Sequence, residues 1–106
     1  MEDGTYRIGK SAMENTELVL RSADYDVWFH IDAVPSAHLI YYNPERLSLE
    51  ALRKSGVIYR MAAALKKRSK YRKTTNIDVI YDYISNIKPT PTPGLVYTNK
   101  PKTIQV

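Results

Sequence analysis

The chain has 106 residues, of which 43% are hydrophobic, and it carries a formal net charge of +5 with no cysteine. This length suits one domain with a modest core, which we expect to span residues 1–106, and the lack of thiols excludes disulfides, cysteine nucleophiles and zinc sites built on sulfur. No apolar run approaches the roughly 20 residues of a membrane span, and the acidic start is no signal peptide, so we expect a cytoplasmic protein.

The charge is unevenly distributed along the chain. Residues 1–50 carry nine acids and four bases, whereas residues 51–106 carry two acids and twelve bases. Nine of these bases lie between Arg53 and Lys73, in a stretch without any acid. An ordinary exposed helix intersperses Glu among its Lys. The stretch therefore predicts an anionic partner, with nucleic acid first and a membrane surface or an acidic protein next. A solvated helix face is the alternative.

The first predicted elements are a short strand over residues 5–8 and a short helix over about residues 11–22. Ser11 and Glu14 have the spacing of a capping box, in which each side chain accepts a hydrogen bond from a free backbone N–H group. Gly9 forms the turn before this helix. A glycine turn at a helix N-terminus exposes N–H groups that are able to hold a phosphate, and a simple turn is the alternative.

The next predicted strand, residues 26–32, has an aromatic and ionisable face that a plain core does not require. Its odd-numbered positions are apolar and form a core face, whereas Trp28 and His30 occupy the other face. A second strand over residues 37–43 follows a turn at residues 33–36. Two apolar runs joined by a short turn predict a hairpin.

The register of this hairpin decides whether His30 and His38 share a face. A four-residue loop at positions 33–36 would pair His30 with Leu39 and separate the two imidazoles, whereas a three-residue or five-residue loop would place them side by side. A slip of one residue moves every side chain to the other face, so both alternatives stay open at this point. A buried ring that orders the hairpin through hydrogen bonds is the structural interpretation of either histidine.

One long helix is expected over about residues 48–70, with a serine as its N-cap. Its apolar stripe includes Gly56 and Tyr59 at a three-four spacing, and the bases between the apolar positions give it a cationic side. The cationic character continues through residues 66–73, where Tyr71 lies among lysines and arginines. That composition is typical of surfaces that hold phosphates and stack a base.

The C-terminal part is predicted to add a strand, a stiff loop and a hairpin. Residues 76–84 form the strand, and three prolines at alternate positions make residues 86–94 an extended surface loop, where function is often found. Residues 94–98 and 102–106 would form the last hairpin. The elements together predict an α+β fold, in which one long helix and a short N-terminal helix pack on a mostly antiparallel sheet of about five to six short strands.

Four segments, taken in this order, resemble the NFACT-R domain family of ribosome-associated quality control proteins. They are Ile-Gly-Lys-Ser-Ala-Met-Glu-Asn at 8–15, Asp-Val-Trp-Phe-His at 26–30, Ser-Ala-His at 36–38, and Asn-Ile-Lys-Pro-Thr at 86–90 with Pro-Gly-Leu-Val at 93–96. The chain closely resembles the stand-alone eukaryotic branch of the family, although it lacks the coiled coil of that protein. The resemblance implies an α+β fold and an RNA-binding module without established catalysis.

Two groups of candidate site residues follow. Those expected to hold nucleic acid are Arg53, Lys54, Arg60, Lys66, Lys67, Arg68, Lys70, Tyr71, Arg72, Lys73 and Lys88. Those expected from the family motifs are Gly9, Lys10, Glu14, Asn15, Asp26, Trp28, His30, Ser36, His38 and Asn86.

Particular roles follow for the aromatic and polar members of these groups. Trp28 or Tyr71 would stack a base, and His30 or Asn86 would contact a base edge or a 2′-OH group, although a core position is the alternative for Trp28. RNA in a tRNA or ribosome context is the expected partner, and DNA is a second candidate. We expect neither a cofactor nor a metal ion.

Two other functions stay open as alternatives. An enzyme would need a base, an orienting group and a nucleophile, and the residues of these types are Asp26, His30, Ser36 and His38. The two histidines and a carboxylate would also suit a divalent metal. Because no Gly-x-Ser-x-Gly motif, His-Glu-x-x-His motif or Gly-rich phosphate loop accompanies them, we expect no catalysis. The second alternative is a protein-interaction adaptor that docks on a ribosome-quality-control or RNA-modification complex through residues 89–94.

Overall fold

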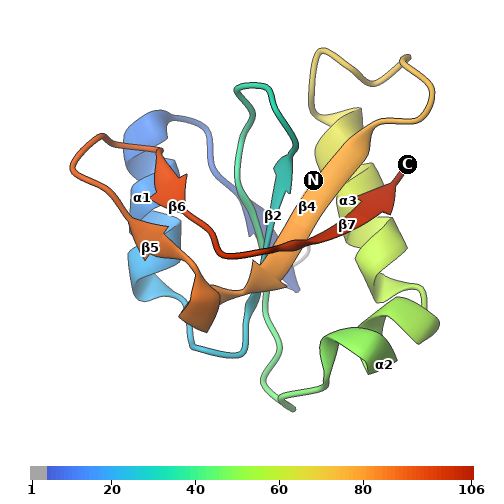
Figure 1. Ribbon diagram of the computed structural model, residues 1–106, viewed down its shortest axis with the longest axis horizontal. Helices are drawn as coiled ribbons and strands as arrows, with labels where there is room; N and C mark the ends of the chain where they lie inside the picture. The colour runs from blue at the N-terminus through green and yellow to red at the C-terminus, as the bar shows by residue number, and fades with distance from the viewer. Residues whose placement is uncertain (1–4) are drawn as a thin grey trace.

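The computed structural model describes residues 5–106, so the acidic start at residues 1–4 lies outside the described range. The main sheet is formed by the strands β1 Tyr6–Ile8, β2 Val27–Ile31, β3 Leu39–Tyr41, β4 Asp78–Tyr83 and β7 Lys102–Gln105. They are antiparallel in the order β1-β3-β2-β4-β7. Three layers result (Figure 1), because α1 (Ala12–Arg21) covers one face of the sheet while α2 (Leu49–Lys54) and α3 (Val57–Lys67) cover the other.

The predicted α+β class is therefore confirmed. Alternation along β2 divides the core between the two faces of the sheet, as expected. Val27 and Phe29 are buried in a cluster with residues of α2 and α3, whereas Trp28 packs with Leu18 of α1 and with Ile87. Within residues 5–106, no helix is both long and apolar enough to cross a membrane.

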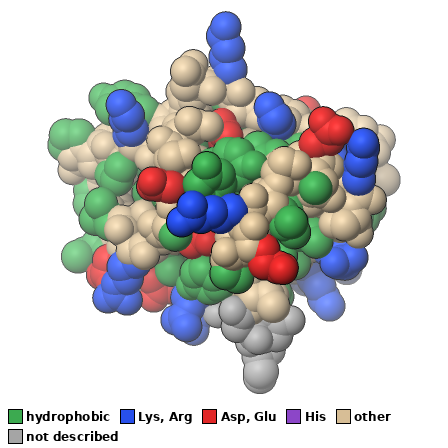
Figure 2. Space-filling model, turned by 90° about the horizontal axis from the view of Figure 1, so that it is seen from below, with side chains coloured by type: hydrophobic (Ala, Val, Ile, Leu, Met, Phe, Trp, Pro, Cys, Tyr) green, Lys and Arg blue, Asp and Glu red, His purple; other side chains and the backbone are tan. Residues whose placement is uncertain are grey.

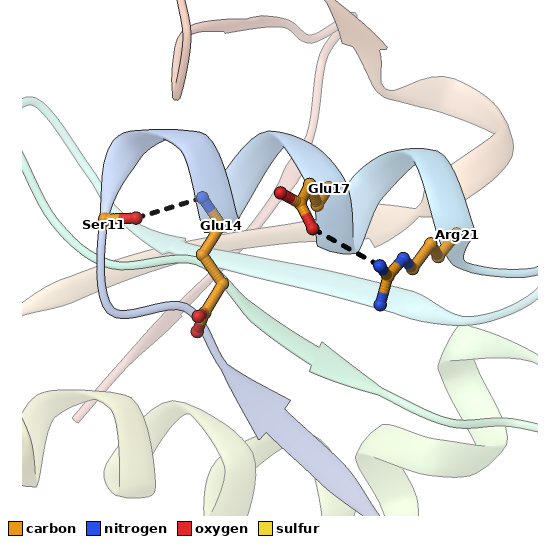
Figure 3. A network of polar contacts seen from close by, with 4 residues as sticks. All are labelled: Ser11, Glu14, Glu17 and Arg21. Carbon is orange, nitrogen blue, oxygen red and sulfur yellow. Dashed lines mark hydrogen bonds and ion pairs between the residues drawn. The ribbon is translucent and has the colours of Figure 1, made fainter.

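The N-terminus of α1 is capped as the sequence predicts, with one difference (Figure 3). The Ser11 hydroxyl accepts a hydrogen bond from the Glu14 N–H group at 3.1 Å. The Glu14 carboxylate accepts one from the N–H group of Lys10 at 3.0 Å, one residue before the N-cap. Further along the helix, the Arg21 guanidinium lies 3.4 Å from the Glu17 carboxylate across one turn. The ends of this short helix are thus held by its own side chains.

The predicted single long helix is wrong, because the chain breaks it into α2 and α3 at Gly56. This residue has φ +89°, a left-handed conformation that ends α2 and that glycine adopts without steric cost. The apolar stripe of this range is confirmed in part. Ile58 and Ala62 are buried as the stripe predicted, whereas Tyr59, which the stripe also placed in the core, is 54% exposed.

The predicted last hairpin is also wrong. Strand β6 (Val96–Tyr97) pairs with β5 (Lys88–Pro89) in a separate two-stranded sheet, which follows the short 3-10 helix Ile84–Asn86. Strand β7 pairs with β4 at the edge of the main sheet instead. The stiff proline-rich segment thus lies at the tip of the β5–β6 hairpin, and the chain then crosses from the side of α1 to β7 (Figure 1).

Candidate nucleic-acid interface

A cleft of about 810 Å³ opens beside α1, on the face of the sheet opposite α3. Its lining comes from the turn before α1, the β2–β3 loop at residues 33–37 and the segment 93–96 that leads into β6. The family-motif residues that line it are Gly9, Lys10, Asn15, Trp28, His30, Ser36 and His38. Segments that lie far apart in the sequence, and that the motifs singled out, therefore meet at one site. We call this site the cleft.

The two histidines lie side by side in the cleft. Strands β2 and β3 pair Trp28 with Ile40 and Phe29 with Leu39, a register that continues to place His30 opposite His38. Their ring centroids are 5.2 Å apart. Of the two registers left open by the sequence, the one in which both imidazoles share a face with Trp28 is therefore the correct one.

His38 is held in one neutral form by its neighbours. The Trp28 indole donates its Nε1–H to Nδ1 of His38 at 3.1 Å, and both side chains are 1% exposed. An indole only donates, so Nδ1 must be the unprotonated nitrogen of the ring. Burial, with a smaller contribution from His30, lowers the pKa of His38 to about 4, against an opposing contact with the Gly94 backbone.

His30 is the half-exposed member of the pair. Its ring stacks on Trp28 with centroids 5.7 Å apart and planes at 13°. Burial lowers the pKa of His30, although the Ile31 backbone and the Asp32 carboxylate act in the opposite direction. Both imidazoles are therefore uncharged at neutral pH, and only His30 combines a place in the cleft with an accessible ring.

The turn before α1 is tied to the hairpin through hydrogen bonds. The Gly9 N–H group donates to the His38 carbonyl at 3.0 Å, and the His38 N–H group donates to Asn15 Oδ1 at 3.2 Å. Because the Glu14 carboxylate and the Ser11 hydroxyl already accept hydrogen bonds from N–H groups at this helix end, the simple-turn interpretation of Gly9 is favoured over a phosphate site.

Three family-motif residues lie outside the cleft and have structural roles. Glu14 caps the turn before α1. Asp26 accepts hydrogen bonds from the N–H groups of Ala23 and Asn43, both at 2.9 Å. Asn86 donates to the Asp82 carboxylate at 2.9 Å. These hydrogen bonds hold the loops that surround the sheet.

The residue types of an enzyme are only partly brought together, because Asp26 lies outside the cleft that His30, Ser36 and His38 line. Asp26 directly precedes β2 and lies four positions from His30, which in extended backbone separates their Cα atoms by about 13 Å. The Ser36 hydroxyl accepts a hydrogen bond from the Ile31 N–H group and donates to the Ala37 carbonyl. Within residues 5–106, no three His, Asp or Glu side chains are grouped so as to hold a metal ion.

Basic residues gather in the last turn of α3 and directly after it, on the other side of the sheet from the cleft. We call residues 66–73 the cationic segment. Its exposed bases are Lys67, Arg68, Lys70, Arg72 and Lys73. Lys66 donates instead to the Val106 carbonyl at 3.0 Å. Tyr71 is half-buried against the core, with the Lys70 ammonium 5.6 Å from its ring centre.

Two predicted base-stacking rings are therefore unsuited to that role. Trp28 is 1% exposed, and Tyr71 has one side on the core and a lysine over its ring. The burial of Trp28 follows from its place on a central strand, as the core interpretation predicted. His30 is the aromatic candidate that is left in the cleft.

The remaining candidate bases are dispersed, and some have partners. Arg53 donates to the Tyr81 hydroxyl at 2.8 Å, and Lys54 lies 3.1 Å from the Glu50 carboxylate. Arg60 and Lys88 are exposed on α3 and β5, on opposite sides of the sheet. On the face seen from below, basic and acidic side chains are intermixed with hydrophobic ones (Figure 2).

The loop that lines the cleft and the cationic segment lie at the same end of the sheet. The Asp32 N–H group donates to the Asp78 carbonyl at 2.9 Å, which places the β2–β3 loop beside the start of β4. Figure 1 shows that loop and the loop between α3 and β4 at one end of the molecule. The sequence indicated both groups separately but carried no signal for this proximity, nor for the cleft positions Ile80 and Thr98.

Known proteins resemble this chain over most of its length. A family model described as the NFACT protein RNA binding domain matches residues 2–98. Two relatives share the name coiled-coil domain-containing protein 25. The protein from Mus musculus is 32% identical over 93 residues, covering 85% of this chain and 44% of the relative. The protein from Danio rerio is 29% identical over 86 residues, covering 81% and 42%. The chain thus spans less than half the length of these relatives.

A solved structure has the same fold. It is the C-terminal part of the fibronectin/fibrinogen-binding protein from Streptococcus suis, which superposes with a TM-score of 0.79 at 23% sequence identity. The match covers 95% of this chain and 39% of that one. The likeness establishes the three-layer arrangement as a known fold.

Proposed function

The chain belongs to the NFACT protein RNA binding domain family, as its motifs indicated, and we propose that it is an RNA-binding module whose cationic segment holds phosphates. The observation that carries this proposal is the exposure of Lys67, Arg68 and the three further bases of the segment, in a stretch of sequence without acids. Each phosphate that such a base neutralises releases condensed counterions, which favours binding.

The remaining details of the proposal follow from RNA as the partner. We propose that residues 1–106 act as one domain, without catalysis, on RNA in a tRNA or ribosome context, and that the protein works in the cytoplasm. DNA carries the same phosphates, so the distinction between the two must come from base or 2′-OH contacts.

Charge reversal in the cationic segment tests the proposal. We expect Lys67→Glu with Arg68→Glu to weaken binding to a labelled single-stranded RNA about tenfold or more at low salt, because two phosphate contacts become repulsive. Fluorescence anisotropy would measure the affinity. Both side chains are exposed, and a thermal melt would confirm that the variant is folded.

A matched control changes the net charge equally at the other end of the sheet. Arg21 ends α1, and Arg46 lies over the Tyr25 ring at 5.3 Å in the loops beside the start of β2. Arg21→Glu with Arg46→Glu should leave the affinity within about twofold, because screening limits the effect of distant charges. Equal losses in both variants, or no loss in the segment variant, would contradict the proposed role of the segment.

A further inference from the structure

We propose that the cleft binds an unpaired base of the RNA, with His30 as the residue that contacts it. This inference rests on the RNA-binding function proposed above and names the part of the RNA that the second surface recognises. It concerns a different site from the cationic segment, so the two are separable by experiment.

The first argument is the chemistry of the cleft. Among its lining residues only Lys10 carries a fixed charge, and no acid lines it. The two imidazoles are neutral at neutral pH, because burial lowers the pKa of each ring. Such a lining suits an uncharged ligand with a polar edge, whereas phosphates are better held by the exposed bases elsewhere.

The second argument is the arrangement of rings. Trp28 and His30 stack nearly parallel, and His38 meets His30 edge-on at 81°. Because Trp28 and His38 are 1% exposed, His30 is the ring of this group that a ligand reaches. A neutral imidazole offers one donor and one acceptor, and unstacked RNA bases are read by stacking and by hydrogen bonds to their edges.

The third argument is size and position. A volume of about 810 Å³ lies within the range of small-molecule sites and accommodates a base with its ribose. The β2–β3 loop that lines the cleft adjoins the start of β4, which residues 74–77 connect to the cationic segment. An RNA strand held by that segment is therefore at the correct end of the sheet to insert a base.

Trp28 provides a direct reporter of occupancy. It is the single tryptophan of the chain and lines the cleft, so its emission is read selectively in the presence of nine tyrosines. We expect a single-stranded oligouridine or oligoadenosine to change Trp28 emission on binding. A blunt-ended RNA duplex, in which every base is paired, should bind through its phosphates and leave Trp28 emission unchanged.

Variants then locate the contact. His30→Ala should lower the affinity for the single strand by about fivefold or more while that for duplex RNA is kept, because it removes the ring on which an unpaired base stacks. Leu95→Ala removes an exposed side chain that lines the cleft, so it tests the cleft without risk to the core. Leu20→Ala on α1 is its control, because Leu20 is similarly exposed and lies outside the cleft.

The results separate the two proposals. Single-strand binding with constant Trp28 emission, and with full affinity in His30→Ala and Leu95→Ala, would overturn the cleft as a base site and leave the cationic segment as the RNA-binding surface. An apolar peptide would then be the occupant to test. Absence of binding to every RNA at low salt would overturn the proposed function and this inference together.

Discussion

The histidines of the cleft are kept neutral by burial rather than by a charged partner. His38 lies under Trp28 and beside His30, and each neighbour opposes a charge on it. A proton on Nδ1 would oppose the indole N–H group, which is 3.1 Å away, and a charge on His30 would repel it. The Asp32 carboxylate is the acid that acts on the pair, and it raises the pKa of His30 without overcoming burial.

Stability should therefore fall as the solution becomes acidic. The pKa of His38 is about 4 in the folded protein and 6.5 in an unfolded chain, so the unfolded state binds more protons between these values. The stability that the neutral, buried His38 contributes is fully present above pH ~6.5 and is lost as the pH falls toward about 4. The resulting decrease in unfolding free energy is at most about 3 kcal/mol. Urea unfolding at a series of pH values would measure it.

The control for this prediction is His38→Asn. An Asn Oδ1 atom stands near the place of the imidazole Nδ1 and still accepts the Trp28 N–H group, but it does not titrate. In this variant the unfolding free energy should fall much less over that pH range, and the remaining decrease should come from His30. An unchanged pH dependence would show that His38 is not the titrating group.

The sequence could indicate these residues but not their relative placement. Alternation put Trp28 and His30 on one face, and that was correct. The face of His38 depended on the β2–β3 loop, where Ala33 adopts φ +62°. Alanine rarely adopts a left-handed conformation, so the sequence predicted a turn here but not the length of the loop that sets the register.

At the scale of elements, the contact between α1 and β3 depends on a missing side chain at Gly9. A Cβ atom there would lie 1.9 Å from Asn15 Oδ1. We expect Gly9→Ala to lower the unfolding free energy by about 2 kcal/mol, because Asn15 must rotate and leave the buried N–H group of His38 without an acceptor. Urea unfolding monitored by circular dichroism would measure the change.

A double-mutant cycle tests the stated cause. In an Asn15→Ala background the obstructing oxygen and the hydrogen bond are both gone, so Gly9→Ala should cost about 0.5 kcal/mol or less. Residues in contact deviate from additivity in this way. An equal cost of Gly9→Ala in both backgrounds would place the strain elsewhere in the turn.

Where local patterns were strong, the elements were predictable. Helix α1 and strands β2 and β4 carried a cap or clear alternation, and each was found within a few positions of its predicted range. The break at Gly56 was missed because one glycine costs a helix only about 1 kcal/mol, so an apolar pattern continues through it.

The pairing of the last strands was missed for another reason. Strands β5 and β6 have two residues each, too few to show alternation. Strand β7 pairs with β4, whose partner residues lie 21 to 27 positions earlier in the chain. Such a pairing is decided by the space left at the edge of the sheet, which no local pattern reports.

At the scale of the whole molecule, one sheet separates two kinds of surface. The charge asymmetry could be predicted from the sequence, because a run of basic side chains is exposed whatever the pairing of the strands. The cleft could not be predicted in this way, because it forms only when α1, the β2–β3 loop and the β5–β6 tip meet over the face of the sheet opposite α3. The proposed functions of the two surfaces differ accordingly, one ionic and one uncharged.

That difference predicts distinct salt dependences. The slope of log affinity against log salt is negative. Lys67→Glu with Arg68→Glu should make it shallower by about 1.4, at about 0.7 for each lost contact with single-stranded RNA. His30→Ala should lower the affinity by the same factor at every salt concentration and leave the slope unchanged, because an uncharged contact releases no counterions. Anisotropy titrations over a salt series would measure both. A shallower slope in His30→Ala would mean that His30 contacts a phosphate as a cation, contrary to its lowered pKa.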